Sequence, residues 1–154
     1  DFASIFGRHY GPVEAIDCDD ADVILVMAGT TASTCRELIR GLRAKGEKVG
    51  LLKLRMFRPF PVAAIRESLA KAKKVAVVDR NNSAGAGGIF AQELRAALCG
   101  GEASPAVYSY VAGLGGRDVT MDTLEKIYRA TREAAEPTRG SVWIDCDEEL
   151  ANSL

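Results

Sequence analysis

The sequence predicts an α/β domain of three layers, with helices on both faces of a mainly parallel sheet of four or five strands. Short apolar runs alternate along the chain with segments whose apolar residues recur at helical spacing. The run Val75–Val78 is apolar at every position, which is typical of a strand inside a parallel sheet. The 154 residues are 47% hydrophobic and 27% charged, which fits one globular domain.

The first half of the chain contains two of the expected strands and two helices. Strands are expected over Asp22–Ala28 and Val49–Leu54, because both runs are almost wholly apolar. The helix between them is indicated by the apolar stripe Cys35, Leu38, Ile39 and Leu42, and Gly46 suits its end. Pro61 suits the first turn of the next helix, whose inward stripe is Val62, Ile65 and Leu69.

The second half repeats this alternation. After the strand at Val75–Val78, a helix is indicated by Phe90, Leu94, Ala97 and Leu98, and a strand is expected over Ala106–Ala112. Thr120 can cap the last helix, and Val119 can pack on Leu124. Ser141–Asp145, with the only tryptophan, is expected as a short edge strand. Right-handed crossovers between the strands complete the predicted topology.

We expect three parts along the chain. Residues 1–20 are interpreted as a linker from a missing preceding domain, residues 21–145 as a single α/β domain, and residues 146–154 as a tail. The chain starts at Asp1 rather than at methionine, which suggests a piece of something longer. The only histidine, His9, lies in a Gly- and Pro-containing turn without an acidic or cysteine companion, so we expect no catalytic role for it.

Charge and cysteine content exclude several classes of function. The net charge of −1 argues against a nucleic-acid or anionic-membrane binder, and no apolar run is long enough to cross a bilayer. The cysteines are Cys18, Cys35, Cys99 and Cys146, and none has the spacing of a zinc or iron–sulfur ligand pair. We therefore expect four free, unreactive thiols in a reducing, cytoplasmic compartment, with Cys35 and Cys99 on helix faces and no bound metal.

The distinctive residues of the sequence follow the strands. In a parallel sheet the strand carboxyl ends share one edge, where ligands or partners usually bind. Four loops are expected there: Gly29–Thr31, Arg55–Pro61, Asp79–Gly88 and Gly113–Asp118. They contain hydroxyls at a helix start and several arginines, which suit an anion. They contain no nucleophile with a neighbouring base, so no catalytic residue is predicted.

Two interpretations of these loops remain open. The glycines do not match the dinucleotide fingerprint, and packing of the Gly85–Gly88 turn against another domain is favoured over ligand binding. Two pairs of adjacent, oppositely charged residues can each hold a loop in place: Asp79–Arg80 and Arg117–Asp118. For Arg117–Asp118, a position in an interface is the equal alternative. The candidate interface or anion-binding residues are Gly29, Thr30, Thr31, Arg58, Asp79, Arg80, Asn81, Gly85, Gly87, Gly88, Arg117 and Asp118.

The same motifs resemble a known family. They are Gly7-Arg8-x-Tyr10-Gly11, Arg58-Pro59-Phe60-Pro61, Asp79-Arg80-Asn81 with Gly85-x-Gly87-Gly88, and Gly113-Leu114-Gly115-Gly116-Arg117-Asp118. In this order they resemble the alpha subunit of pyruvate:ferredoxin oxidoreductase and its 2-oxoacid relatives. The resemblance implies the carboxyl-terminal region of that subunit, a domain similar to the last domain of transketolases.

Members of that family decarboxylate a 2-oxoacid on thiamine diphosphate, reduce ferredoxin through iron–sulfur clusters and transfer the acyl group to coenzyme A. The resemblance implies that the glutamate activating the thiamine lies in a preceding domain. It also implies that thiamine diphosphate, magnesium and the clusters are held chiefly by other subunits, which would be this chain's partners. We therefore expect a structural and interface domain that is inert alone. The alternatives are a free-standing module binding a phosphate, a carboxylate or coenzyme A, and the terminal domain of a transketolase-type or 2-oxoacid dehydrogenase enzyme.

Overall fold

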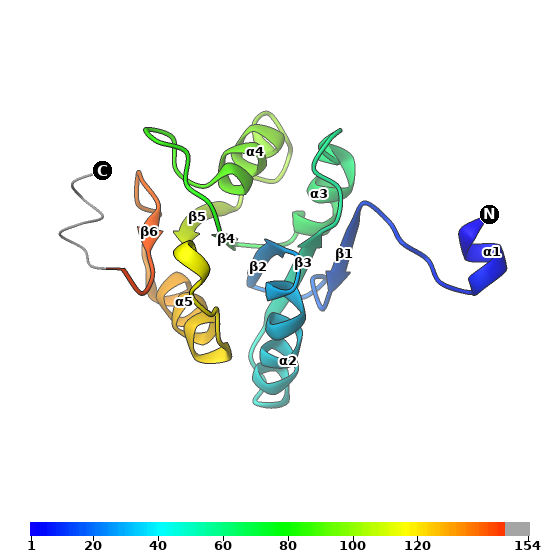
Figure 1. The fold of residues 1–154 in the computed structure, drawn as a ribbon, viewed down its shortest axis with the longest axis horizontal. Coiled ribbons are helices and arrows are strands. Elements are labelled where there is room, and N and C mark those ends of the chain that lie inside the picture. The colour runs from blue at the N-terminus through cyan, green and yellow to red at the C-terminus, as the bar shows by residue number, and fades with distance from the viewer. Residues whose placement is uncertain (147–154) are drawn as a thin grey trace.

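The computed structural model describes residues 1–146, which form a six-stranded sheet with helices on both faces (Figure 1). The strand order is β1-β3-β2-β4-β5-β6. The strands are β1 (Val13–Ile16), β2 (Val23–Ala28), β3 (Val49–Leu54), β4 (Lys74–Asp79), β5 (Ala106–Val111) and β6 (Val142–Trp143). All neighbouring pairs are parallel except β1 and β3. The mainly parallel sheet predicted from the sequence is confirmed, and so is the edge strand carrying Trp143.

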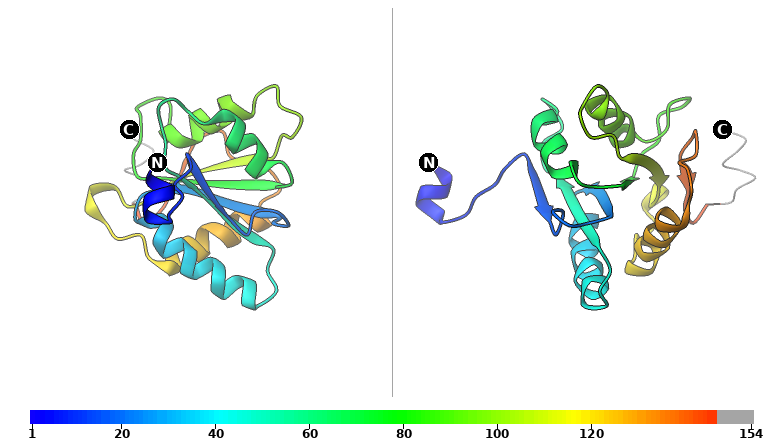
Figure 2. Two further views of the ribbon diagram at one scale, coloured as in Figure 1. Left: turned by 90° about the vertical axis from the view of Figure 1, so that its right-hand side faces the viewer. Right: turned by 180° about the vertical axis from the view of Figure 1, so that it is seen from behind.

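Two helices cover each face of the sheet, as predicted. The helices are α1 (Phe2–Phe6), α2 (Thr31–Ala44), α3 (Val62–Leu69), α4 (Ile89–Leu98) and α5 (Met121–Glu133), with a 3₁₀ turn η1 (Leu114–Gly116) before α5. α3 and α4 lie on one face, and α2 and α5 lie on the other (Figures 1 and 2). The predicted cap of α5 is present, because the Thr120 side chain accepts a hydrogen bond from the Thr123 N–H at 3.2 Å. No helix within residues 1–146 is both long and apolar enough to cross a bilayer.

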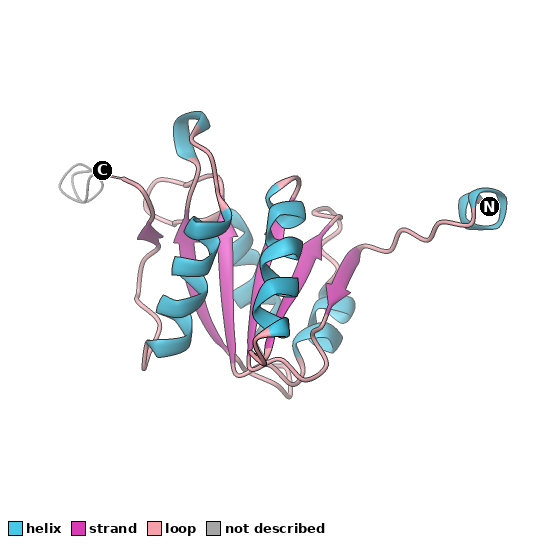
Figure 3. Cartoon of the chain, turned by 90° about the horizontal axis from the view of Figure 1, so that it is seen from below, coloured by secondary structure: helices cyan, strands magenta, loops and turns pink. Residues whose placement is uncertain are grey.

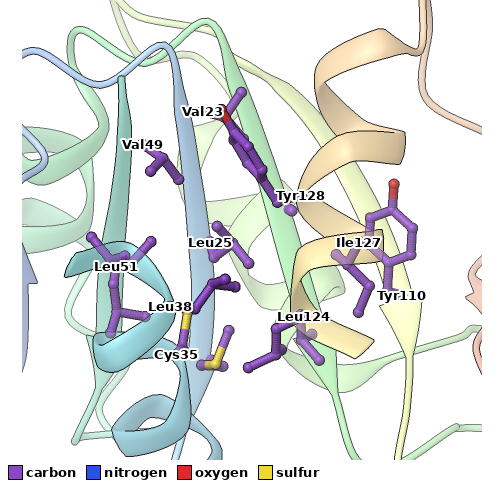
Figure 4. Packing of buried hydrophobic residues seen from close by; sticks show 14 of the residues in the cluster. Val23, Leu25, Cys35, Leu38, Val49, Leu51, Tyr110, Leu124, Ile127 and Tyr128 are labelled. Atoms are coloured by element: carbon purple, nitrogen blue, oxygen red, sulfur yellow. The ribbon is translucent and has the colours of Figure 1, made fainter. Parts of the chain in front are cut away.

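The central strands are apolar at every position because both of their faces are buried. Along β2, Val23, Leu25 and Met27 point to the cluster under α2 and α5, and the alternate residues Ile24 and Val26 point to the cluster under α3 and α4. Figure 4 shows the first cluster, where Leu25 and Val49 of the sheet face Leu38, Leu124 and Tyr128 of the helices. These two cores are what hold the strand ends in fixed positions.

The lysine that opens β4 also stabilises the end of α5. Lys74 Nζ donates hydrogen bonds to the carbonyl oxygens of Thr131, Arg132 and Ala134, at 3.1, 2.7 and 2.6 Å. These carbonyls have no partner within the helix, and a cation favours the negative end of the helix dipole. Lys74 thereby joins the amino-terminal end of β4 to the carboxyl-terminal end of α5.

The sheet has six strands rather than four or five, because residues expected as a linker form β1. Val13 packs on one core and Ile16 on the other, while Cys18 is buried just beyond the strand. β1 is therefore part of the sheet and of its packing. β1 is an edge strand that pairs antiparallel with β3. Because it has only four residues and none of them is fully buried, its hydrophobic pattern is too short to be recognised in the sequence. Of the expected tail, residues 147–154 lie outside the described residues.

Candidate functional site

The carboxyl ends of β2, β3, β4 and β5 lie at one edge of the sheet, which we call the carboxyl edge (Figure 3). The four loops predicted from the sequence meet there. The chain leaves β2 for α2 on one face and leaves β4 for α4 on the other face. Neighbouring strands whose connections diverge in this way mark the usual position of ligands in open α/β sheets. The loops after β2 and β4 are therefore the first place to look for a site.

The loop after β4 is organised by the buried carboxylate of Asp79. This side chain accepts hydrogen bonds from the N–H groups of Phe90 at 2.9 Å and Ala91 at 3.1 Å, in the first turn of α4. Asn81 Oδ1 accepts the N–H of Ile89 at 3.2 Å. Burial raises the pKa of Asp79 above its ordinary value, and the two backbone donors act in the opposite direction. The expected pair between Asp79 and Arg80 is wrong, because Asp79 points into the domain and caps α4.

Gly88 is required by the close approach of this carboxylate. A Cβ atom built at Gly88 would lie 2.2 Å from Asp79 Oδ2. The N–H of Gly88 is itself taken by Ser141 Oγ at 3.3 Å. The N–H groups of residues 88–91 are therefore all satisfied by side chains of this chain. In nucleotide-binding folds the same N–H groups hold a phosphate, so the amino terminus of α4 does not suit a diphosphate here.

The glycine turn itself is a small hairpin. Ser83 and Gly87 exchange two backbone hydrogen bonds, at 2.8 and 2.9 Å. Gly85 and Gly87 have φ values of 74° and 85°, which favour glycine. A Cβ at Gly87 would also lie 2.7 Å from Ser141 Oγ. The close neighbours of Gly87 and Gly88 are the side chains of Ser141 and Asp79, whereas a Cβ at Gly85 would meet nothing within 4 Å.

The loops after β4 and β5 touch one another through Arg80. Its guanidinium donates a hydrogen bond to the carbonyl oxygen of Gly113 at 3.3 Å. Gly113 has a φ of 74°, and a Cβ there would meet Val119 at 2.7 Å and the Arg80 side chain at 3.0 Å. Within residues 1–146, Arg117 and Asp118 form no ion pair with each other, so the alternative in which this pair holds the loop is wrong, and the interface alternative stays a prediction.

Arg58 does not join the other arginines of the carboxyl edge. Its guanidinium is 2.6 Å from Glu93 Oε1 on α4 and lies 4.0 Å from the centroid of the Phe57 ring. The Phe57 ring in turn packs edge-on against Phe60 and Phe90. Arg58 thus ties the loop after β3 to α4. The loop after β2 is also less open than expected, because the Thr31 side chain is buried while Gly29 and Thr30 are exposed.

The cysteines provide neither a reactive pair nor a metal site within residues 1–146. Burial raises the pKa of Cys18 to about 11 and that of Cys35 to about 12, so both thiols stay protonated near neutral pH. All four thiols are free, as predicted. Cys99 is exposed rather than packed on a helix face, because α4 ends at Leu98.

The clearest feature that the sequence did not reveal is the position of the exposed apolar side chains. The large apolar residues exposed within residues 1–146 are Phe2, Ile5, Phe6, Tyr10, Met56, Val62, Met121 and Val142. Met56, Val62 and Met121 lie in or beside loops of the carboxyl edge. The others lie on β6 or on residues 1–12, and none lies in the loops of the opposite edge. Exposed apolar side chains at one edge of a sheet make that edge a candidate surface for contact with another protein.

Residues 1–12 form an arm that leaves the sheet from the amino end of β1, at the carboxyl edge (Figure 1). The Phe2 ring contacts the rings of Phe6 and Tyr10, at centroid distances of 4.7 and 5.7 Å. The guanidinium of Arg55 lies 5.1 Å from the Tyr10 centroid and joins the arm to the loop after β3. Five residues are too few for a helix that is stable on its own, so α1 with its exposed aromatic residues suits a partner surface.

Comparison with known proteins identifies the family of this chain. The family model described as pyruvate:ferredoxin oxidoreductase core domain II matches residues 21–124. Pyruvate synthase subunit PorA of Methanothermobacter thermautotrophicus is 45% identical over 149 residues, which are 97% of this chain and 37% of that subunit. The chain thus spans less than two fifths of the length of this relative.

Two solved structures share the fold. The 2-oxoglutarate:ferredoxin oxidoreductase from Magnetococcus marinus, with 2-oxoglutarate, coenzyme A and succinyl-CoA bound, has a TM-score of 0.57 and 25% identity over 86% of this chain and 21% of that chain. A split-gene transketolase, an inactive beta4 tetramer, has a TM-score of 0.60 and 14% identity over 80% of this chain and 43% of that chain. The second likeness shows a transketolase-like fold alone.

Proposed function

Because the chain belongs to the pyruvate:ferredoxin oxidoreductase core domain II family, we propose that it is the carboxyl-terminal structural and interface domain of the alpha subunit of a 2-oxoacid:ferredoxin oxidoreductase. The reaction is the oxidative decarboxylation of a 2-oxoacid, with pyruvate as the first substrate to test, to an acyl-CoA with reduction of ferredoxin. In this proposal the domain is inert alone, and it acts in a cytoplasmic complex by holding other subunits or domains in position.

The observation that carries this proposal is the gathering of exposed apolar side chains at the carboxyl edge and on the arm. Met56 lies in the loop after β3 and Met121 is the first residue of α5, yet both lie at the same edge of the sheet. Aromatic residues, methionine and arginine are enriched in protein interfaces. The arm combines Phe2 and Tyr10 with Arg8, and Tyr10 contacts Arg55 of the loop after β3. We therefore assign the carboxyl edge and the arm together as the docking surface.

The chemistry of the same edge supports an interface role rather than a catalytic one. Asp79 is the buried carboxylate of the site, and two backbone N–H groups occupy it as a helix cap. No cluster of three potential metal ligands occurs within residues 1–146. These residues do not fit thiamine diphosphate, magnesium or an iron–sulfur cluster, so we assign those groups, and the coenzyme A site of the reaction, to the other parts of the complex.

We also propose a revised division of the chain. The body of the domain extends from β1 to β6, residues 13–143, because β1 packs on both cores. Residues 1–12 act as the arm that connects the body to the rest of the alpha subunit. This division replaces the linker of residues 1–20 expected from the sequence.

Reconstitution tests the proposed function. The chain alone is mixed with pyruvate, coenzyme A and oxidised ferredoxin, and then with the remaining parts of the alpha subunit and the other subunits of the complex. We expect no ferredoxin reduction by the chain alone and 2-oxoacid-dependent reduction by the complete mixture. Turnover by the isolated chain, or a complete mixture whose activity is the same with and without this chain, would contradict the proposal.

A further inference from the structure

A hollow beside the carboxyl edge has features that the docking role does not use. It lies between the 83–87 hairpin, α4 and β6, and its volume is about 340 Å³. Its wall includes Ser83, Gly87, Arg95, Arg139, Ser141 and Trp143. This volume is at the lower end of the range for small-molecule sites, so the hollow suits a small ligand.

The charge of this hollow distinguishes it from the others on the molecule. Among the described residues, its wall contains the two arginines and no carboxylate. Four other hollows also contain arginine or lysine, but each includes at least one aspartate or glutamate. Neither Arg95 nor Arg139 forms an ion pair within residues 1–146. Arg95 interacts electrostatically with the buried Asp79 carboxylate, but no described carboxylate lines the hollow itself, so its two guanidinium groups favour a negatively charged ligand.

Several groups of the wall are held in place. The Arg95 guanidinium donates a hydrogen bond to the carbonyl oxygen of Val107 at 3.3 Å, which anchors it to β5 and leaves its other N–H groups for a ligand. Ser141 Oγ is 2.7 Å from Ser109 Oγ. A Cβ atom at position 87 would lie 2.7 Å from the same Ser141 oxygen. Glycine at this position therefore leaves room for the Ser141 hydroxyl at the wall of the hollow.

We propose that this hollow binds the phosphate group of a small phosphate monoester whose planar organic part contacts Trp143. Guanidinium forks match phosphate oxygens in geometry as well as in charge. Serine hydroxyls add donors for a third oxygen, and an indole provides a large apolar surface for a ring. The site uses neither Arg58 nor Arg117, the arginines that the sequence suggested for an anion.

Tryptophan fluorescence tests this site directly, because Trp143 is the only tryptophan of the chain. The full 154-residue chain is titrated with AMP, inorganic phosphate, adenosine and pyruvate at about 0.1 M salt, and calorimetry confirms each binding curve. We expect saturable binding of AMP, weaker binding of inorganic phosphate and pyruvate, and no binding of adenosine. No fluorescence change and no heat with AMP up to about 10 mM would overturn the proposal. Adenosine binding as tightly as AMP would also overturn it.

A pair of arginine variants locates the binding. Arg139→Ala removes an exposed guanidinium of the wall, and we expect AMP affinity to fall about tenfold or more. Arg40→Ala removes an exposed guanidinium of α2, on the other face of the sheet, and we expect no change. Both variants should melt like the parent. Equal affinity of the two variants would contradict the site. These titrations use the chain alone, so their failure is distinct from a failure of reconstitution.

Discussion

Gly88→Ala tests whether the buried Asp79 carboxylate organises the carboxyl edge. The backbone of Gly88 has φ −68° and ψ 135°, which alanine adopts without strain, so the added methyl group acts only through its contacts. It would lie 2.2, 2.5 and 2.7 Å from Oδ2, Cγ and Cβ of Asp79. These are not flexible ends of a side chain, because the carboxylate is fixed by two backbone donors.

The cost follows from what must move. Overpacking a buried site typically costs about 1–3 kcal/mol, and losing a helix cap costs about 1 kcal/mol. We expect Gly88→Ala to lower the free energy of unfolding by about 3 kcal/mol, or the melting temperature by about 6–12 °C. Urea unfolding followed by circular dichroism measures the change.

Two comparisons make this test specific. Gly41→Ala lies in the middle of α2, where a Cβ meets nothing within 4 Å, and we expect it to stabilise the domain by up to about 1 kcal/mol. In an Asp79→Ala background the clash is removed, so Gly88→Ala should cost much less than in the parent. If Gly88→Ala changes the stability of the parent by less than about 0.5 kcal/mol, the proposed packing of Asp79 is wrong.

Three further predictions concern buried groups. Burial raises the pKa of Asp79 in the folded state, so the stability that protonated Asp79 contributes is complete below the unfolded pKa of about 3.9 and is lost as pH rises through the folded pKa. Urea titrations should therefore show that the stability deficit of Asp79→Asn relative to the parent shrinks as pH rises. A deficit that does not depend on pH would contradict the raised pKa. The thiols of Cys18 and Cys35 should react with a thiol reagent only after unfolding, whereas Cys99→Ser should remove a fast-reacting thiol of the native chain; fast labelling of Cys18 or Cys35 would contradict their burial. Val77→Asp places an unpaired charge in the middle of β4 and should cost several kcal/mol; a melting curve like that of the parent would refute the central position of that strand.

The sequence predicted the parts of the fold that depend on the hydrophobic pattern of consecutive residues or on contacts between residues close in the sequence. β2, β3, β4 and β5 are recognisable because strands with helices on both faces are apolar at nearly every position. The cap at Thr120 is recognisable because its partner lies three residues away. β1 was missed because four residues at an edge, with Glu14 among them, have too little periodicity.

The details of the site depended on contacts that neighbouring residues do not reveal. Asp79 and Arg80 were expected to pair because they are adjacent, but consecutive residues at the end of a strand point to opposite faces. Asp79 therefore points inward and Arg80 outward. The partner of Arg58, which lies in the loop after β3, is Glu93, 35 residues away on α4. Only the packing of α3 beside α4 brings these two side chains together.

The affinity of this chain for the remaining parts of the complex tests the docking surface most directly. The double variant Met56→Asp, Met121→Asp places two charges at the carboxyl edge, and Lys71→Asp places one charge at the opposite edge. All three side chains are exposed in the native fold, so we expect these substitutions to leave the fold intact. We expect the double variant to weaken association, measured by analytical ultracentrifugation, at least about tenfold. Lys71→Asp should bind like the parent. Unchanged association of the double variant would contradict the docking role of the carboxyl edge, and so would an equal weakening by Lys71→Asp.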